Sequence, residues 1–155
     1  MRALVQRVNR ASVSVAGEIT GEIDKGLVVL IGVAGTDTGQ DAQYVMNKVI
    51  NLRIFDDESG KFNLSTADVS GGLLLISQFT LFADTRRGRR PGFTEAAPPE
   101  TALHLFEYCV RLAQESGLPV ATGRFQQHMQ VEIHNDGPVT ILIDSQDRTM
   151  PRSAF

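Results

Sequence analysis

Two short polar segments adjoin apolar runs and carry the groups best placed to do chemistry. Ser77-Gln78-Phe79-Thr80 ends one apolar run, and Asn135-Asp136-Gly137-Pro138-Val139-Thr140 opens another. Where a buried strand leaves the core, a fold can hold small polar groups and backbone N–H groups rigidly beside a reacting group. Backbone N–H groups near Phe79 and Thr80 can hold a developing oxyanion. Each such donor typically lowers the activation free energy by about 3–4 kcal/mol.

The Thr80 hydroxyl is the other chemical group in the first segment. A threonine nucleophile needs a base within hydrogen-bond reach, itself oriented by a third group. No feature of the sequence pairs Thr80 with a histidine and a carboxylate. The plainer interpretation is that a strand over 72–82 reaches the surface at Gln78 and Thr80, which share a face with core residues. The pattern alone favours this plainer interpretation.

The second segment reads as a turn that precedes a strand. Proline fits the first position of a strand, so a tight connection is a sufficient explanation of Asn135 to Pro138. About 5% of peptide bonds before proline in folded proteins are cis. A cis bond before Pro138 would create a rigid feature whose carbonyl groups could face a ligand.

Length and composition predict one globular domain over residues 1–155. Hydrophobic residues make up 42% and charged residues 21% of the 155, so a core can form without a metal or a disulfide. Cys109 is the one cysteine; it falls on the apolar stripe of a predicted helix, where a small buried side chain is expected. The apolar stretch from Leu27 to Gly35 is too short for a bilayer, and residues 1–7 lack a signal-peptide core. We therefore expect a cytoplasmic protein without membrane contact.

The basic residues are unevenly chosen and unevenly placed. The net charge is −3, and arginines outnumber lysines twelve to three. Four of them are Arg86, Arg87, Arg89 and Arg90. The planar guanidinium suits phosphate and carboxylate, so an acidic protein with one arginine-rich loop is expected to contact a polyanion locally. Taken alone, such a run is more often a solvated loop.

The histidines do not predict a metal site. His104 lies in a predicted helix without an acidic or cysteine partner at ligand spacing. His128 and His134 share a strand face, but the rise of a strand separates them by roughly 20 Å. No metal and no cofactor are expected.

Hydrophobic periodicity predicts a mixed, largely antiparallel α/β fold with two main helices. Strands are expected over 2–10, 12–15, 19–23, 27–33, 72–82, 129–133 and 139–143. Helices are expected from about 40 to 52, and from Pro98-Pro99 to a stop at Ser116-Gly117. Residues 83–99 form a loop, and the tail over 144–155 has no predicted element. No strand–helix–strand unit recurs in the way that a doubly wound sheet requires.

Five segments, in order along nearly the whole chain, resemble the D-aminoacyl-tRNA deacylase family. They are Met1-Arg2-Ala3-Leu4-Val5-Gln6-Arg7-Val8, Leu52-Arg53-Ile54-Phe55, Ser77-Gln78-Phe79-Thr80-Leu81, Arg89-Arg90-Pro91-Gly92-Phe93 and Asn135-Asp136-Gly137-Pro138-Val139-Thr140. One tetrapeptide would be a weak match, whereas the ordered set is specific. The resemblance implies a barrel-like domain and an enzyme that hydrolyses the ester between a D-amino acid and the 3′-terminal adenosine of tRNA.

The resemblance also implies roles for individual residues. The family's catalytic motif corresponds to Ser77, Gln78, Phe79 and Thr80. Gly137 and Pro138 match a Gly-cis-Pro pair that one subunit of a homodimer inserts into the other's site, where it excludes L-side chains but lets glycine pass. Arg7 matches an arginine that holds this loop, and Met129 is in register with a pocket residue. Beside a tRNA substrate, phosphate contact becomes the favoured role of Arg86, Arg87, Arg89 and Arg90.

Catalysis in this family is described as RNA-assisted: the terminal ribose 2′-OH helps to activate water, and the protein backbone orients the ester. A Thr80 nucleophile ranks second. Two other functions stay open, a small-ester hydrolase that uses Thr80 and a non-catalytic RNA-binding module, although no aromatic-rich stacking strand supports the latter. The chain departs from the family at Gln126-Gln127-His128, where small residues are usual, so a different pocket shape is expected.

Overall fold

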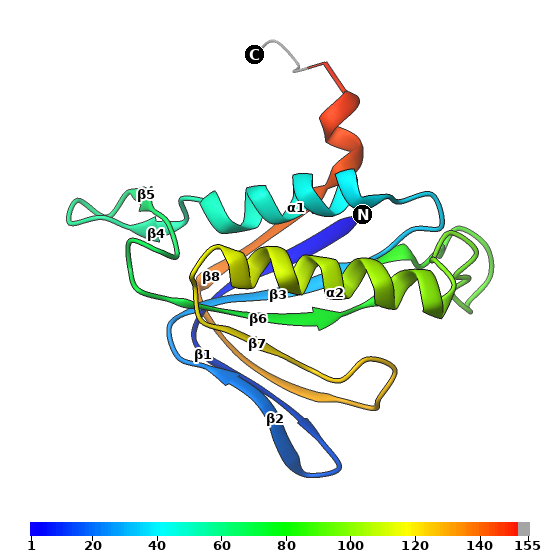
Figure 1. Ribbon diagram of the computed structural model, residues 1–155, viewed down its shortest axis with the longest axis horizontal. Helices are drawn as coiled ribbons and strands as arrows, with labels where there is room; N and C mark the ends of the chain where they lie inside the picture. The colour runs from blue at the N-terminus through cyan, green and yellow to red at the C-terminus, as the bar shows by residue number, and fades with distance from the viewer. Residues whose placement is uncertain (152–155) are drawn as a thin grey trace.

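The computed structural model describes residues 1–151 and consists of a curved sheet with two helices on one face (Figure 1). The sheet contains β1 (Arg2–Val15), β2 (Glu18–Ile23), β3 (Gly26–Gly32), β6 (Gly72–Ser77), β7 (Val120–Thr122) and β8 (Gln130–Asp144). A separate hairpin consists of β4 (Phe55–Asp56) and β5 (Phe62–Leu64). The helices are α1 (Gly39–Asn51), α2 (Pro99–Glu115) and two short 3₁₀ helices, η1 (Phe79–Phe82) and η2 (Ser145–Thr149).

β1 organises the sheet. Along one edge it pairs antiparallel with β3 and then with β2, and along its other edge it pairs antiparallel with β8. β3, β6 and β7 pair in parallel. The sheet curves until β2 approaches β7, where a Cβ on Gly21 would lie 2.6 Å from the carbonyl oxygen of Thr122. This barrel-like mixed sheet with two main helices confirms the predicted fold class.

Both faces of β6 are buried, which explains its unbroken apolar sequence. Leu73 and Leu75 pack toward the helices, and Leu74 and Ile76 pack toward the inside of the curve. Each such side chain stabilises the fold by about 1.5–3 kcal/mol through burial. The end of β6 is therefore held firmly in place.

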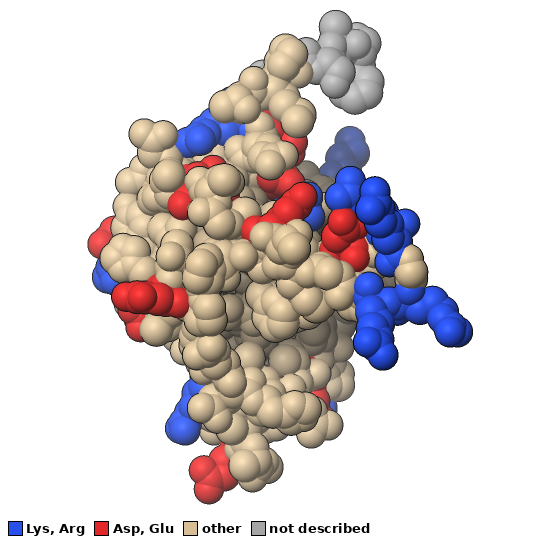
Figure 2. All heavy atoms as spheres, turned by 90° about the vertical axis from the view of Figure 1, so that its right-hand side faces the viewer, with Lys and Arg blue, Asp and Glu red and all other residues tan. Residues whose placement is uncertain are grey.

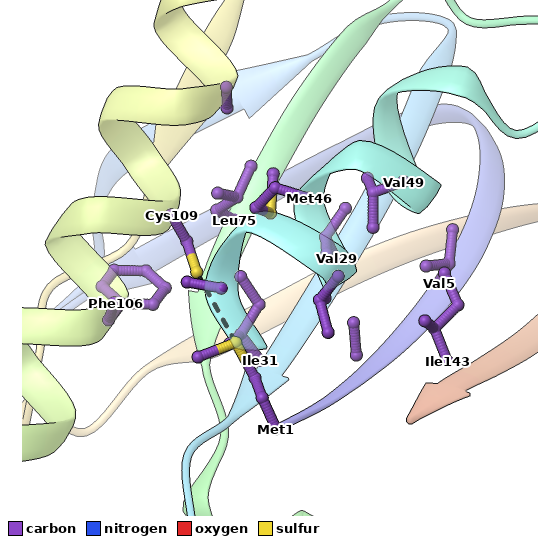
Figure 3. Close-up of a cluster of buried hydrophobic side chains, with 14 of the residues drawn as sticks. Met1, Val5, Val29, Ile31, Met46, Val49, Leu75, Phe106, Cys109 and Ile143 are labelled. Carbon is purple, nitrogen blue, oxygen red and sulfur yellow. Dashed lines mark hydrogen bonds between the residues drawn. The ribbon is translucent and has the colours of Figure 1, made fainter. Parts of the chain in front are cut away.

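Cys109 is buried in α2, as predicted. Its sulfur lies 3.8 Å from the sulfur of Met1 (Figure 3). Burial raises the pKa of the Cys109 thiol to about 12. The thiol therefore stays protonated near neutral pH and is not a nucleophile.

Both predicted helices are confirmed. α1 follows Thr38, whose backbone N–H donates to the Asp41 carboxylate at 2.8 Å and so satisfies a donor that the helix leaves free. α2 begins at Pro99, which needs no N–H donor in a first turn. It ends before Gly117, where a φ of +82° favours glycine.

The predicted strand over 72–82 is wrong in its second half. Ser77 pairs with Ile31, and because β3 ends at the next residue, β6 has no further backbone to pair with on that side. The chain turns instead into η1. Gln78 and Thr80 therefore do not share a strand face.

β1 and β8 are each one strand where two were predicted. The predicted turn at Asn135–Pro138 is a bulge within β8, where the register against β1 shifts. The Asn135 side chain closes this bulge, because it accepts from the Val139 N–H at 2.7 Å and donates to the Val139 carbonyl oxygen at 3.3 Å. The strand consequently continues in the same direction on both sides of Gly137 and Pro138.

The sequence reading missed β7 and the β4–β5 hairpin, which are too short for periodicity to detect. It also missed two strand–helix–strand connections, β3–α1–β6 and β6–α2–β7. Both place their helix on the same face (Figure 1), whereas a doubly wound sheet has helices on both faces.

No helix within residues 1–151 is long and apolar enough to span a membrane. The tail begins with the end of β8 and η2, and residues 152–155 lie outside the described part of the chain.

Candidate active site

A cavity of about 660 Å³ opens where β6 leaves the sheet. Its walls come from the end of β6, the loop before α2 and the segment before β8. Among the predicted site residues, the structure brings together Ser77, Gln78, Phe79 and Met129 in these walls. The remaining lining is mostly apolar: Val33, Ile76, Phe93, Ala96, Ala97, Pro99, Ala102, Phe125, Gln126, Gln127 and Val131.

The backbone of Gln78 fixes the start of η1. Its N–H donates to the Ile31 carbonyl oxygen at 2.7 Å, and its carbonyl oxygen accepts from the Leu81 N–H at 3.2 Å. Gly32 permits this close packing, since a Cβ there would lie 3.0 Å from the Gln78 carbonyl oxygen. The N–H groups that open a helix have no partner within it. Those of Phe79, which lines the cavity, and of Thr80, the next residue, lie in this first turn of η1.

Thr80 stands apart from the cavity lining. Its hydroxyl oxygen accepts a hydrogen bond from the side-chain amide of Gln78. An amide does not take up a proton near neutral pH, so this contact does not activate the hydroxyl. The geometry supports a backbone role for the segment over a nucleophilic Thr80.

Gln126 and Gln127 line the cavity, so the departure from the family pattern reaches its wall. Gln126 has a φ of +59°, which is uncommon for a residue with a side chain. His128 instead lines a separate depression of about 490 Å³. Met129 passes close to Gly123, where a Cβ would lie 2.5 Å from the Met129 sulfur.

Gly137 and Pro138 are exposed and are not part of the cavity lining. The peptide bond between them is cis. Gly137 has a φ of +135°, and a Cβ there would lie 2.8 Å from Val139 Cγ2 and 3.2 Å from Arg7 Nη2. Glycine is therefore required at this position.

Arg7 is buried beneath this bulge, with 5% of its surface exposed. Its Nε donates to the Asp136 carbonyl oxygen at 3.0 Å, and its Nη1 donates to the Ile54 carbonyl oxygen at 2.7 Å. The carboxylates of Asp136 and Asp56 lie 3.5 and 3.6 Å from the guanidinium and compensate its charge. Arg7 thus ties the bulge to the chain beside β4.

The arginine loop, residues 84–92, lies beside the cavity. An antiparallel bridge between Asp84 and Gly92 closes it, and the ring of Phe93, which follows, packs edge-on against Phe79 with 5.0 Å between centroids. All four loop arginines are exposed. Figure 2 shows basic side chains gathered along one edge of the face on which this loop lies.

No group of three or more His, Cys, Asp or Glu side chains within residues 1–151 is arranged to hold a metal ion. His104, His128 and His134 are all exposed. Asp84 and Asp136 are instead paired with Arg86 and Arg7.

Comparison with known proteins decides the family. The model of the D-Tyr-tRNA(Tyr) deacylase family matches residues 4–144. The chain belongs to this family. A protein named D-aminoacyl-tRNA deacylase from Dehalococcoides mccartyi is 59% identical over 152 residues, which cover 98% of this chain and 99% of that protein. One of the same name from Fervidobacterium nodosum is 57% identical over 145 residues, covering 94% and 97%.

Solved structures show the deacylase fold. A structure titled c-Myc DNA Unwinding Element Binding Protein superimposes with a TM-score of 0.87 at 40% identity, covering 93% of this chain and 98% of that one. A structure of a probable eukaryotic D-amino acid tRNA deacylase superimposes with a TM-score of 0.80 at 15% identity, covering 92% and 98%. The second likeness is one of fold alone.

Sequence reasoning missed part of this cavity. Phe93 and Ala96 lie in a loop without periodicity, and tertiary contacts alone place them in the wall. The Gly35 N–H donates to the Glu95 carbonyl oxygen at 3.0 Å, which pins the loop beside the end of β3. The available sequence signal for this part of the cavity was that Phe93 belongs to a segment that resembles the deacylase family, Arg89-Arg90-Pro91-Gly92-Phe93.

Arg7→Lys is expected to lower the free energy of unfolding by about 1.5–3 kcal/mol, the contribution of one hydrogen bond to a charged group. An ammonium group cannot reproduce the fork that reaches both Asp136 and Ile54. Urea denaturation measures the loss. Arg10→Lys, an exposed position on the same strand, is the matched control and should stay within about 0.5 kcal/mol of wild type. Equal stability of the two variants would contradict the role given to Arg7.

Proposed function

We propose that this protein hydrolyses the ester bond of D-aminoacyl-tRNA and releases the D-amino acid and free tRNA. Membership of the deacylase family supports this activity. The observation that carries it is the cavity at the end of β6, where Ser77, Gln78 and Phe79 line a mostly apolar space beside an arginine loop. Such a cavity fits an amino-acid side chain, and the loop fits an RNA backbone. The cytoplasm, where tRNA is charged, is the proposed location.

In this reaction the oxygen of water bonds to the ester carbonyl carbon, and the bond from that carbon to the ribose 3′ oxygen breaks. The ribose 2′-OH helps to activate the water and relays a proton to the departing 3′ oxygen. The N–H groups of Phe79 and Thr80 hold the oxyanion that develops on the carbonyl oxygen. Each fixed donor of this kind stabilises the transition state by about 3–4 kcal/mol. No protein side chain has to act as a base.

Selection against L-amino acids is assigned to Gly137 and Pro138. Because both are exposed and outside the cavity of their own chain, we assign them to the cavity of a second copy in a homodimer. Rigid backbone close to the substrate α-carbon leaves no room for an L-side chain. Glycine has no side chain to exclude, so glycyl-tRNA is a second proposed substrate.

The protein should release D-tyrosine from D-tyrosyl-tRNA at least about a hundredfold faster than L-tyrosine from L-tyrosyl-tRNA, a difference of about 2.7 kcal/mol in the barrier. The measurement is single-turnover deacylation with each enantiomer, corrected for spontaneous hydrolysis. A non-catalytic RNA-binding module would release neither amino acid. Equal rates for both enantiomers would contradict the proposed selectivity.

Thr80→Ala should retain activity within about tenfold of wild type, because the backbone N–H groups remain. A substrate whose terminal ribose is 2′-deoxy should react at least about a hundredfold more slowly, as expected when a group that moves protons is lost. Single-turnover rates for both changes separate the two mechanisms. The reverse pattern would identify Thr80 as the nucleophile of an ester hydrolase.

Sedimentation velocity at micromolar concentration should show a dimer. Pro138→Ala should then reduce the ratio of D- to L-tyrosyl-tRNA hydrolysis by about tenfold or more, since rigid contact worth at least about 1.4 kcal/mol is lost. Pro119→Ala, an exposed proline before β7, is the matched control and should leave the ratio unchanged. A monomer under these conditions would rule out the cross-subunit role.

A further inference from the structure

We propose that the arginine loop is a preformed clamp for the single-stranded 3′ end of the RNA. In this clamp Asp84 and Arg86 set the shape, and Arg87, Arg89 and Arg90 hold phosphates. The inference rests on the proposed function and adds which part of the RNA the loop holds and which side chains hold it.

The loop is closed at its base by the protein itself. The Asp84 N–H donates to the Gly92 carbonyl oxygen at 2.8 Å, and the Gly92 N–H donates back to the Asp84 carbonyl oxygen at 2.9 Å. Gly88 lies near the tip with a φ of +67°, a conformation that favours glycine. A closed loop presents its side chains without first having to be ordered.

Asp84 and Arg86 form an ion pair with each other. The Asp84 carboxylate accepts from the Arg86 backbone N–H at 3.0 Å, from its Nε at 2.8 Å and from its Nη2 at 2.7 Å. These bonds hold the pKa of the Asp84 carboxyl well below its usual range. Because the guanidinium fork already binds a carboxylate, Arg86 is the loop arginine least available to a phosphate.

The other three arginines have no such partner. Arg87, Arg89 and Arg90 are exposed, and none of them forms an ion pair with a carboxylate of the described residues 1–151. Three uncompensated positive charges on one short closed loop form a local site for a polyanion.

The position of the loop decides which phosphates it can reach. Phe93 follows the closing bridge directly, lines the cavity and packs against Phe79. Arg90 is three residues from Phe93, so their Cα atoms are at most about 11 Å apart. The phosphates next to the ester are those of the last few nucleotides, which are single-stranded in tRNA. A basic track beside an exposed aromatic ring is how proteins hold such strands; Phe79 is 55% exposed.

The test compares two substrates, full-length D-tyrosyl-tRNA and a D-tyrosylated tetranucleotide that keeps only the single-stranded 3′ end. Replacing Arg87, Arg89 and Arg90 together by Ala should raise KM by roughly tenfold or more for both substrates, by the same factor, with kcat unchanged. The slope of log kcat/KM against log salt concentration should fall by about 2, because each single-strand phosphate contact contributes about 0.7. The control replaces Lys48, Arg53 and Lys61 by Ala. It removes the same charge from α1, from the segment between α1 and β4 and from the β4–β5 turn, far from the loop (Figure 1).

Asp84→Asn and Arg86→Ala separate the positioning role from direct phosphate contact. Each should raise KM by a similar, smaller factor, and the double variant should be no worse than either single variant, because both changes open the same loop. The salt slope should stay near that of wild type. Additive effects with a reduced slope would make Arg86 a phosphate contact and overturn this division of roles.

A rise in KM with tRNA but not with the tetranucleotide would place the loop on the body of the tRNA and overturn the clamp. An unchanged KM with both substrates would also overturn it. If the wild-type protein releases no D-tyrosine from either substrate, the proposed function fails. The clamp proposal is then tested by fluorescence anisotropy with the tetranucleotide that carries no amino acid. Weaker binding by the triple variant than by wild type supports the clamp, and equal binding overturns it.

Discussion

The antiparallel pairing of β1 with β8 is the constraint on which the rest of the structure depends. It runs from Arg2 opposite Asp144 to Ser14 opposite Gln130, and its register shifts twice, at the bulge and again between Val8 and Arg10. Met129, the residue before β8, lies in the cavity wall, and the bulge holds Gly137 over Arg7. Because a strand cannot change length, the two features stay at a fixed separation along the sheet. One chain therefore carries both parts of the proposed site in different places, and a second copy is the simplest means of joining them.

The cavity itself follows from where strands end. β3 and β6 are parallel neighbours, so their carboxyl ends reach the same edge of the sheet, and such edges are where α/β folds bind ligands. The Ala97 N–H donates to the Val33 carbonyl oxygen at 2.9 Å, which ties the loop before α2 to the end of β3. The cavity is left between that tie, the turn into η1 and the segment that leads into β8. Four polar residues line it, Ser77, Gln78, Gln126 and Gln127, and the rest of the lining is apolar.

Sequence reasoning predicted the helices well because both carry apolar stripes and α2 also has a clear stop signal at Gly117. It misjudged strand limits wherever tertiary pairing decided them. The local sequence after Ser77 resembles a continuing strand. β6 stops there because its partner β3 ends. The bulge at Asn135 has the composition of a turn, and only the partner strand β1 keeps the chain straight. The order of matched segments identified the family, but the loop that completes the cavity at Phe93 has no periodicity from which a position could be predicted.

The excess of arginine over lysine has two different structural uses. Arg2, Arg7, Arg86 and Arg148 each lie beside a carboxylate, and Arg7 is almost fully enclosed. In these pairs the fork of the guanidinium fixes geometry. Among residues 1–151, Arg10, Arg53, Arg111 and Arg124 form no ion pair and stand singly in the sequence, whereas Arg87, Arg89 and Arg90 stand together. In a chain with 18 acidic and 15 basic residues, pairing elsewhere leaves this loop as a concentrated positive site. An acidic protein can in this way repel nucleic acid over most of its surface and still receive one RNA end at its cavity.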